Sequence, residues 1–214
     1  MTMRKRAGTV LFTAAAAVAL VGISVGPALA ATSLKVKVSG GGSYTATAGK
    51  TVLSDNGVNV TCTKSSAKGT LKNGTYKGKA PVKLGTVSKL GFTSCSSILG
   101  PVTNQVVGTP VLNANSKTST KGKTNGDTAA VITKVDVKVS LTGCSFTVTG
   151  SAPGYYSNKT HTLYMTPKPR VTGSARAGLV VSKVNGCAGV VKNGDKPTYT
   201  ASYKVSRKVV IKSS

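Results

Sequence analysis

The sequence predicts an all-β protein, an antiparallel sandwich or barrel with two disulfides, that follows a cleaved signal peptide. Three observations predict this fold class. Short segments alternate apolar and polar residues, Asn-Gly pairs recur between them, and four cysteines follow an N-terminal segment of secretory type. The alternation has the period of a half-buried strand, whereas apolar residues do not recur at helical spacing after the N-terminal segment.

The first 30 residues have the parts of a secretory signal peptide in the usual order. Three basic residues at positions 4–6 precede an apolar run over residues 10–25, and Ala-Leu-Ala follows at positions 28–30. A basic start, an apolar stretch and a small-residue cleavage site define such peptides. The apolar run is short for a membrane span of about 20 residues. We therefore expect a signal peptide over residues 1–30 and a single secreted, extracellular β domain over residues 31–214, with no membrane span after cleavage.

Strand signals recur along the expected domain. The alternating segments cover residues 34–38, 135–139, 198–205 and, less regularly, 208–212. Thr, Val and Tyr fill these segments and favour strands. Asn-Gly pairs suit tight hairpin turns because both residues tolerate positive φ, and five such pairs begin at Asn56, Asn73, Asn125, Asn185 and Asn193. Short strands between regular turns predict a sandwich or barrel, and the lack of crossover helices excludes a parallel α/β fold.

A polar, repetitive stretch over residues 113–126 divides the expected domain into two halves. We expect this stretch to form a long exposed loop. The halves echo one another, since each has an Asn-x-Thr triplet, then a Val-Ser-Lys-apolar segment, then a cysteine. An old duplication explains the echo, and so does chance in a chain rich in Thr, Lys and Val.

The cysteines are Cys62, Cys95, Cys144 and Cys187. An even number of cysteines in an exported chain predicts disulfides. Three pairings are possible, and the echo between the halves favours Cys62–Cys95 with Cys144–Cys187. The rival interpretation is a metal site, but the chain has no close cysteine pair and only one histidine, so the usual ligand spacing is absent. We expect no metal and no cofactor.

Several short segments around the cysteines resemble a known group of proteins. These segments are Cys62 to Gly69, Phe92 to Cys95, Gly143-Cys144, Tyr156 to Asn158 and Cys187 to Asp195. They are similar to small secreted actinobacterial proteins of streptomycete type, which are disulfide-containing β proteins mostly of unassigned function. Some members of that group carry a cholesterol-esterase name. The resemblance therefore implies, as an alternative function, a small secreted lipid or sterol esterase.

The residue types argue against the common hydrolytic sites. The Gly-x-Ser-x-Gly motif of many serine hydrolases is absent, and His161 is the only histidine that could act as a base. Glycosidase chemistry needs two facing carboxylates, whereas three of the four acids, Asp55, Asp127 and Asp195, lie in turn contexts. The fourth, Asp136, alternates with lysines. We therefore assign no catalytic residue and favour a protein that is not an enzyme.

Positive charge is the strongest functional signal. Three of the 29 basic residues precede Ala30, which leaves 26 against four aspartates and no glutamate, a formal net charge of +22. Nearly all of these bases are lysine, a hydrated point charge, rather than arginine, which favours bidentate phosphate and base contacts. Such a charge creates a strong attractive field for polyanions. It predicts electrostatic association with an anionic cell-surface polymer, such as those of the cell wall, and no specific nucleic acid.

Basic residues at alternating positions face one side of a strand, as we expect for Lys134 with Lys138 and Lys204 with Lys208. The alternative is that these lysines only solvate a strand face or protect a sheet edge from pairing. The candidate polyanion-binding residues are Lys117, Lys121, Lys123, Lys134, Lys138, Lys204, Arg207 and Lys208.

Overall fold

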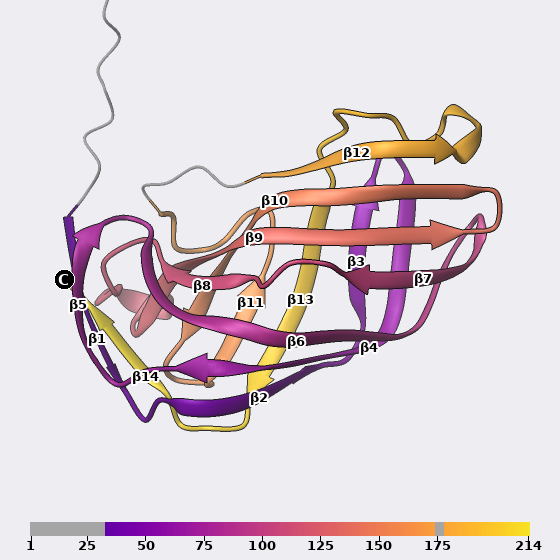
Figure 1. The fold of residues 1–214 in the computed structure, drawn as a ribbon. Helices are drawn as coiled ribbons and strands as arrows, with labels where there is room; N and C mark the ends of the chain where they lie inside the picture. The colour runs from indigo at the N-terminus through magenta and orange to yellow at the C-terminus, as the bar shows by residue number, and fades with distance from the viewer. Residues whose placement is uncertain (1–32, 174–177) are drawn as a thin grey trace, which may run out of the picture. The chain divides into compact units, whose positions relative to one another are not determined.

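The computed structural model describes residues 33–173 and 178–214 (Figure 1). The expected signal peptide, residues 1–30, lies outside the described residues, as does Arg176. No α-helix occurs in the part of the chain that is described, which consists of strands, two short 3-10 turns and connections. The elements are β1 (Ser33–Ser39), β2 (Gly42–Ala48), β3 (Thr51–Asp55), β4 (Val58–Leu71), β5 (Gly74–Lys79), β6 (Val82–Ser97), β7 (Gly100–Val106), β8 (Val111–Ala114), η1 (Gly122–Thr124), β9 (Asp127–Leu141), β10 (Cys144–Ser157), β11 (Thr162–Met165), β12 (Leu179–Gly186), η2 (Cys187–Gly189), β13 (Thr198–Val205) and β14 (Val210–Ser213).

The predicted antiparallel all-β fold is confirmed. Strand β1 covers the alternating segment 34–38, β9 contains 135–139, and β13 spans the predicted 198–205. The fourth segment is shorter than expected, because β14 starts at Val210 rather than at Lys208. The Asn56-Gly57 pair forms the tight turn between β3 and β4, with φ of 40° and 87° at the two residues, which is the geometry that Asn-Gly favours.

The larger of two sheets closes on itself. Its strands follow the order β10–β11–β13–β2–β4–β6–β7–β9, and β9 pairs with β10 to complete the ring. Strand β3 pairs with β13 and β4, and β8 bridges β6 and β9. The result is a barrel of about eight strands, the size at which the interior just holds its side chains or one small ligand.

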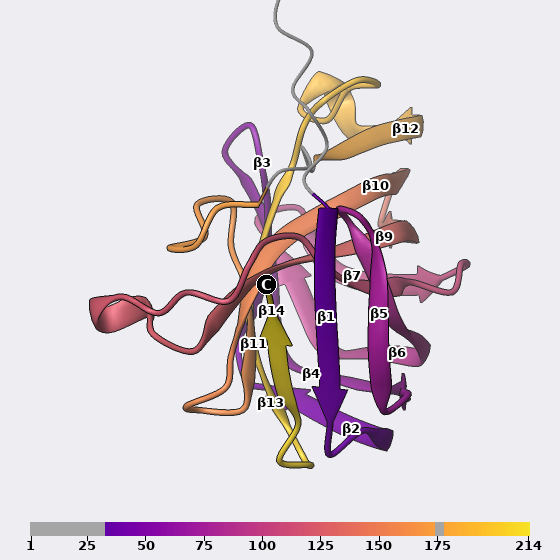
Figure 2. The same ribbon diagram turned by 90° about the vertical axis from the view of Figure 1, so that its left-hand side faces the viewer.

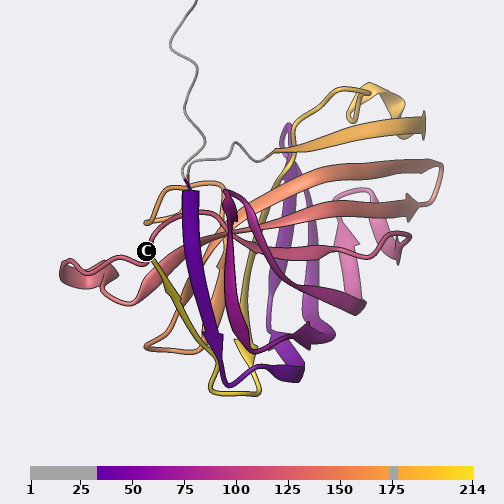
Figure 3. The ribbon, with the colours of Figure 1, turned by 60° about the vertical axis from the view of Figure 1, so that its left-hand side comes forward.

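The smaller sheet has the order β14–β1–β5 and lies at one end of the barrel (Figures 2 and 3). In β1 the odd-numbered residues face outward, whereas Leu34, Val36 and Val38 are at most 2% exposed. These three side chains join Ile211 of β14 in one apolar core with residues of the barrel. Full burial of each such side chain contributes about 1.5–3 kcal/mol, so the small sheet is held by its inner face.

The disulfide pairing favoured by the echo is confirmed. Cys62 of β4 bonds to Cys95 of β6 at directly facing positions. Cys144, the first residue of β10, bonds to Cys187 just after β12. Each disulfide therefore links two strands that are already hydrogen-bonded to each other.

The expectation of an exposed loop over residues 113–126 is wrong at its start. Asn113 and Ala114 belong to β8, and they are buried together with Asn115. A polar residue is accommodated here because the Asn113 amide donates to the carbonyls of Val111 and Val131, at 2.9 and 3.1 Å. Later in the stretch, backbone hydrogen bonds tie it to β9 and β14, including one from Thr118 N to Ser213 O at 2.8 Å.

Strands β4 and β6 approach each other closely at Gly69, beside a register shift between them. A Cβ at this position would collide with the Thr86 carbonyl and lie 2.6 Å from Tyr44 Oη. We expect Gly69→Ala to lower the free energy of unfolding by about 1–3 kcal/mol, the usual effect of overpacking. Urea denaturation measures the change.

Gly49→Ala is the matched control, because no atom lies within 4 Å of a Cβ there and its φ is outside the left-handed region. The control should be neutral or stabilising by up to about 1 kcal/mol. Equal effects of the two substitutions would contradict the close approach at Gly69.

Candidate functional site

Acidic and basic side chains differ in how far they are exposed on the protein. Every lysine of the described chain is exposed. Of the four acids, by contrast, Asp55 and Asp127 are buried, at 7% and 1% exposure, and Asp136 and Asp195 are half-buried. The outer surface of the described residues is therefore almost entirely positive, with little local compensation.

Asp127 takes part in the single ion pair found within residues 33–173 and 178–214. Arg170 Nε donates to Asp127 Oδ2 at 2.7 Å, and the guanidinium lies 4.7 Å from the centre of the Tyr155 ring. Tyr155 in turn stacks on Tyr164, with ring centres 4.8 Å apart. Expected only as a turn residue, Asp127 instead is buried at the start of β9, where it anchors Arg170.

The eight predicted polyanion-binding residues are all exposed but occupy three separate segments. Lys117, Lys121 and Lys123 lie between β8 and β9, whereas Lys134 and Lys138 lie on β9. The third segment runs from Lys204, near the end of β13, through Arg207 and Lys208.

The expectation that Lys204 and Lys208 share one strand face is wrong. Strand β13 ends at Val205, and Lys208 lies in the connection to β14. Just after β13, Ser206 N still donates to Thr45 O of β2 at 2.8 Å, and the Arg207 side chain donates from Nε to Gly40 O at 3.3 Å. The Lys204 amine donates to the Thr160 carbonyl.

The densest registered group of lysines lies elsewhere, on the outer face of the small sheet. We call this group the lysine face; it consists of Lys35, Lys37, Lys77, Lys79 and Lys212. Lys35 lies directly opposite Lys77, and Lys37 lies directly opposite Lys212. Directly opposite side chains have Cβ atoms about 4.5–5.5 Å apart. The strands β1, β5 and β14 contain no acidic residue that could separate these charges.

Like charges at directly opposite positions destabilise a sheet. The Cβ spacing of such pairs is shorter than the Debye length of about 8 Å at physiological salt, so small ions screen the repulsion of directly opposite lysines only in part. An anion with several charges at a similar spacing would relieve this repulsion. Binding of a polyvalent anion would therefore stabilise the lysine face.

Sequence reasoning missed the lysine face as one site. Alternation shows that Lys35 and Lys37 share a side of one strand, and that Lys77 and Lys79 share a side of another. The juxtaposition of β1 with β5 and with the C-terminal β14 is a long-range pairing, which alternation within one strand does not specify.

A carboxyl pair lies at the turn end of β3. Burial, followed by the charge of Asp195 and a hydrogen bond to it, raises the pKa of Asp55 to about 6. Asp195 itself accepts a hydrogen bond of 2.7 Å from Lys192 N. The pair joins the β3–β4 hairpin to the loop before β13, so its protonation bears on how firmly these segments hold together.

The surroundings of His161 do not resemble those of a catalytic base. Its Nδ1 lies 3.2 Å from the Val209 carbonyl and 3.5 Å from Tyr156 Oη. The residue has a positive φ of 51° in the turn between β10 and β11. Among the described residues, no serine hydroxyl or carboxylate is recorded in contact with its ring, so the nucleophile–base–acid geometry is not formed around it.

Within residues 33–173 and 178–214, no group of three or more His, Cys, Asp or Glu side chains is placed to hold a metal ion. In the same residues, no helix has the length and apolar character needed to cross a membrane.

Comparison with protein-family models, with curated proteins and with solved structures found no match for this chain.

The Asp55 carboxyl makes a prediction about pH. Its pKa in the folded protein lies above the unfolded value of about 3.9, so the folded protein binds more protons between these values. The free energy of unfolding should therefore fall as pH rises from about 4 to about 7, with roughly 2–3 kcal/mol of the decrease due to Asp55. Asp55→Asn should remove this component and make the protein more stable at pH 7, as urea denaturation at several pH values would show.

Asp136→Asn is the control, because it removes a half-buried carboxylate on β9 away from the pair. It should leave the slope between pH 4 and 7 in place. Parallel curves for the wild type and Asp55→Asn would refute the assignment.

Proposed function

We propose that this chain is a secreted, non-catalytic protein that associates with anionic polymers of the cell surface through its lysine face. The observation that carries the proposal is the register of the small sheet, which sets Lys35 against Lys77 and Lys37 against Lys212 with no acid between them. Phosphate-rich polymers of a cell wall are the fitting class of partner, because they present closely spaced charges along a flexible chain.

Secretion is supported by the N-terminal pattern and by the cysteines. All four are paired in disulfides, and such bonds persist in oxidising, extracellular environments. Outside the cell the protein meets surface polymers at high concentration. Retention by charge would keep it near the producing cell without a covalent anchor.

The expected binding is of modest specificity. Lysine ammonium groups offer point charges rather than a planar fork, so they neutralise phosphates without reading their arrangement. The long side chains of an exposed sheet face also adapt to differently spaced anions. Other exposed lysines extend the attractive field, and the lysine face supplies its strongest point.

The proposal predicts the effect of neutralising the lysine face. A variant with Lys→Gln at positions 35, 37, 77, 79 and 212 should bind isolated Gram-positive cell walls more weakly than the wild type, as measured by co-sedimentation across a salt series. On a phosphate polymer with the charge density of duplex DNA, each lost contact lowers the slope of log affinity against log salt by about 0.9. The variant should therefore lose about 3–5 from that slope, and it should unfold at the same or a higher urea concentration.

The matched control carries Lys→Gln at positions 50, 64, 159, 168 and 192, which are exposed and lie outside the small sheet. It loses the same net charge and should keep most of the affinity. Equal losses in the two variants would assign binding to the whole surface rather than to the lysine face. Sedimentation that persists after acid extraction of the phosphate polymers, or that ignores salt, would overturn the proposal.

A further inference from the structure

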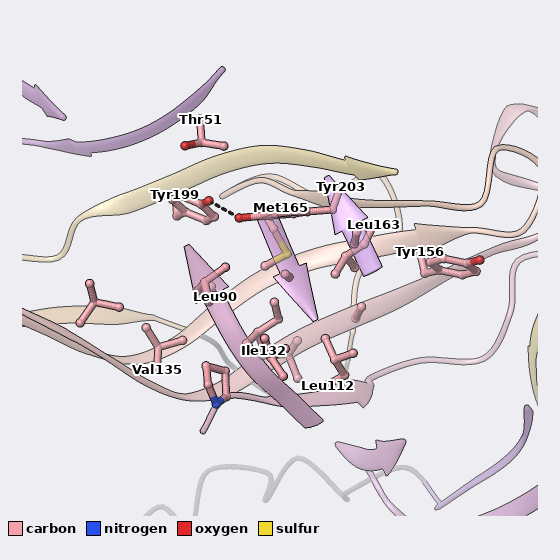
Figure 4. Close-up of a pocket in the computed structure, with 18 of the residues that line it drawn as sticks. Thr51, Leu90, Leu112, Ile132, Val135, Tyr156, Leu163, Met165, Tyr199 and Tyr203 are labelled. Atoms are coloured by element: carbon pink, nitrogen blue, oxygen red, sulfur yellow. Dashed lines mark hydrogen bonds between the residues drawn. The ribbon is translucent and has the colours of Figure 1, made fainter. Parts of the chain in front are cut away.

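The interior of the barrel contains a cavity of about 150 Å³. Figure 4 shows apolar side chains converging on it from neighbouring strands, among them Leu90, Leu112, Ile132, Leu163 and Met165. No charged side chain is among the residues that line it. Burying an unpaired charge in such surroundings is very costly, so the cavity selects against ions.

Several lining side chains are less covered by protein than their position suggests. Leu90, Leu112 and Ile132 are only partly buried although they line the barrel interior. Tyr199 also lines the interior and is likewise only partly buried. Apolar atoms that face a void lack partners and forfeit dispersion energy. A molecule of matching size would restore those contacts.

The four tyrosine hydroxyls of the cavity lining have their protons committed within the protein. Ser65 Oγ donates to the Gly91 carbonyl at 2.9 Å, so the Tyr203 hydroxyl must donate to Ser65 at 2.7 Å. Tyr199 then donates to Tyr203 at 2.8 Å (Figure 4). This chain of hydroxyls ends at a backbone acceptor, so its free capacity is for accepting a hydrogen bond.

The remaining two tyrosines of the lining behave in the same way. Tyr156 donates to Val209 O at 2.8 Å, and Tyr44 donates to Thr86 O at 3.4 Å. Burial raises the pKa of all four tyrosine hydroxyls, so each keeps its proton at neutral pH. A ligand that needs a hydrogen-bond donor would find none among these tyrosines, whereas a ligand hydroxyl could donate to them.

We propose that the barrel interior binds one small, neutral, apolar molecule of about single-ring size, either a hydrocarbon or an alcohol. The size follows from the volume, because an apolar cavity of about 150 Å³ engineered into another protein binds benzene. The preference for neutral molecules follows from the uncharged lining, and the preference for an alcohol over a ketone follows from the committed tyrosine protons. This site is distinct from the lysine face and does not depend on its function.

The test is a titration of the full exported protein with benzene, cyclohexanol, cyclohexanone and benzoate, followed by the methyl NMR signals of Leu, Ile and Met. Benzene and cyclohexanol should produce saturable shifts at Leu112, Ile132 and Met165. Ile98 is 79% exposed on the surface and should not shift, which controls for non-specific contact. Cyclohexanol should bind more tightly than cyclohexanone, and benzoate should not bind.

A filling substitution provides the second arm. Val135→Phe places extra volume in the cavity lining and should weaken benzene binding by at least about tenfold, equivalent to 1.4 kcal/mol. Val180→Phe makes the same chemical change at an exposed position of β12 and should leave the affinity unchanged. If Val135→Phe fails to fold, the titration of the unsubstituted protein decides alone.

Three outcomes would overturn the proposal. The first is the absence of saturable shifts up to the solubility limit of benzene. The second is benzoate binding as tight as that of benzene, and the third is equal affinity of the two Phe variants. Equal affinity for the alcohol and the ketone would overturn the assigned hydrogen-bond preference.

Discussion

The pairing of β9 with β10 is the interaction on which the rest of the structure depends. Thirteen residue pairs join these strands, and β9 also pairs with β7 and β8 while β10 pairs with β11 and β12. Without this pairing the large sheet would be open, with two long unpaired edges. Closure removes these edges, which otherwise invite association with other chains, and it gives every strand of the ring an inside and an outside.

In the closed ring, successive side chains of each strand point alternately into the barrel and out of it. Val137 and Val139 of β9 line the interior, whereas Lys138 between them is exposed. In β14 the same rule places Ile211 against the cavity and Lys212 on the lysine face. An apolar interior and a positive exterior are therefore consequences of one geometric constraint applied to an alternating sequence. The repulsion between surface lysines is tolerated because the inner faces of the same strands are buried, fully in β1 and partly in β5.

Much of this architecture could be predicted from local patterns. Alternation identified β1 and β13, Asn56-Gly57 identified a hairpin, and the echo around the cysteines gave the correct disulfide pairing. Residues whose role depends on distant strands escaped prediction. The sequence predicts that Asn113 lies in a loop, yet it is buried because β8 pairs with both β6 and β9. Asp127 reads as a turn residue, yet its carboxylate is buried against Arg170, 43 positions away. The lysine face depends on the pairing of β1 with β14 at the opposite end of the chain.

The cavity also depends on residues from distant strands, and the sequence alone did not predict it. Leu112, Ile132 and Leu163 would each be assigned to an ordinary core, and nothing in their spacing indicates that the core is left partly unfilled. A barrel of this size sits at the boundary between a filled interior and one that holds a ligand, so the outcome depends on side-chain volumes contributed by many strands. Short side chains at Ala46, Ala67, Ala130 and Ala152 belong to the lining, and larger residues there would occupy the space.

The small sheet links the cavity to the lysine face, since adjacent residues of β14 face the one and the other. A bound anion that relieves repulsion across β1 and β14 would thus stabilise the strand that helps to enclose the cavity, because a ligand that binds only the folded state shifts the equilibrium toward it.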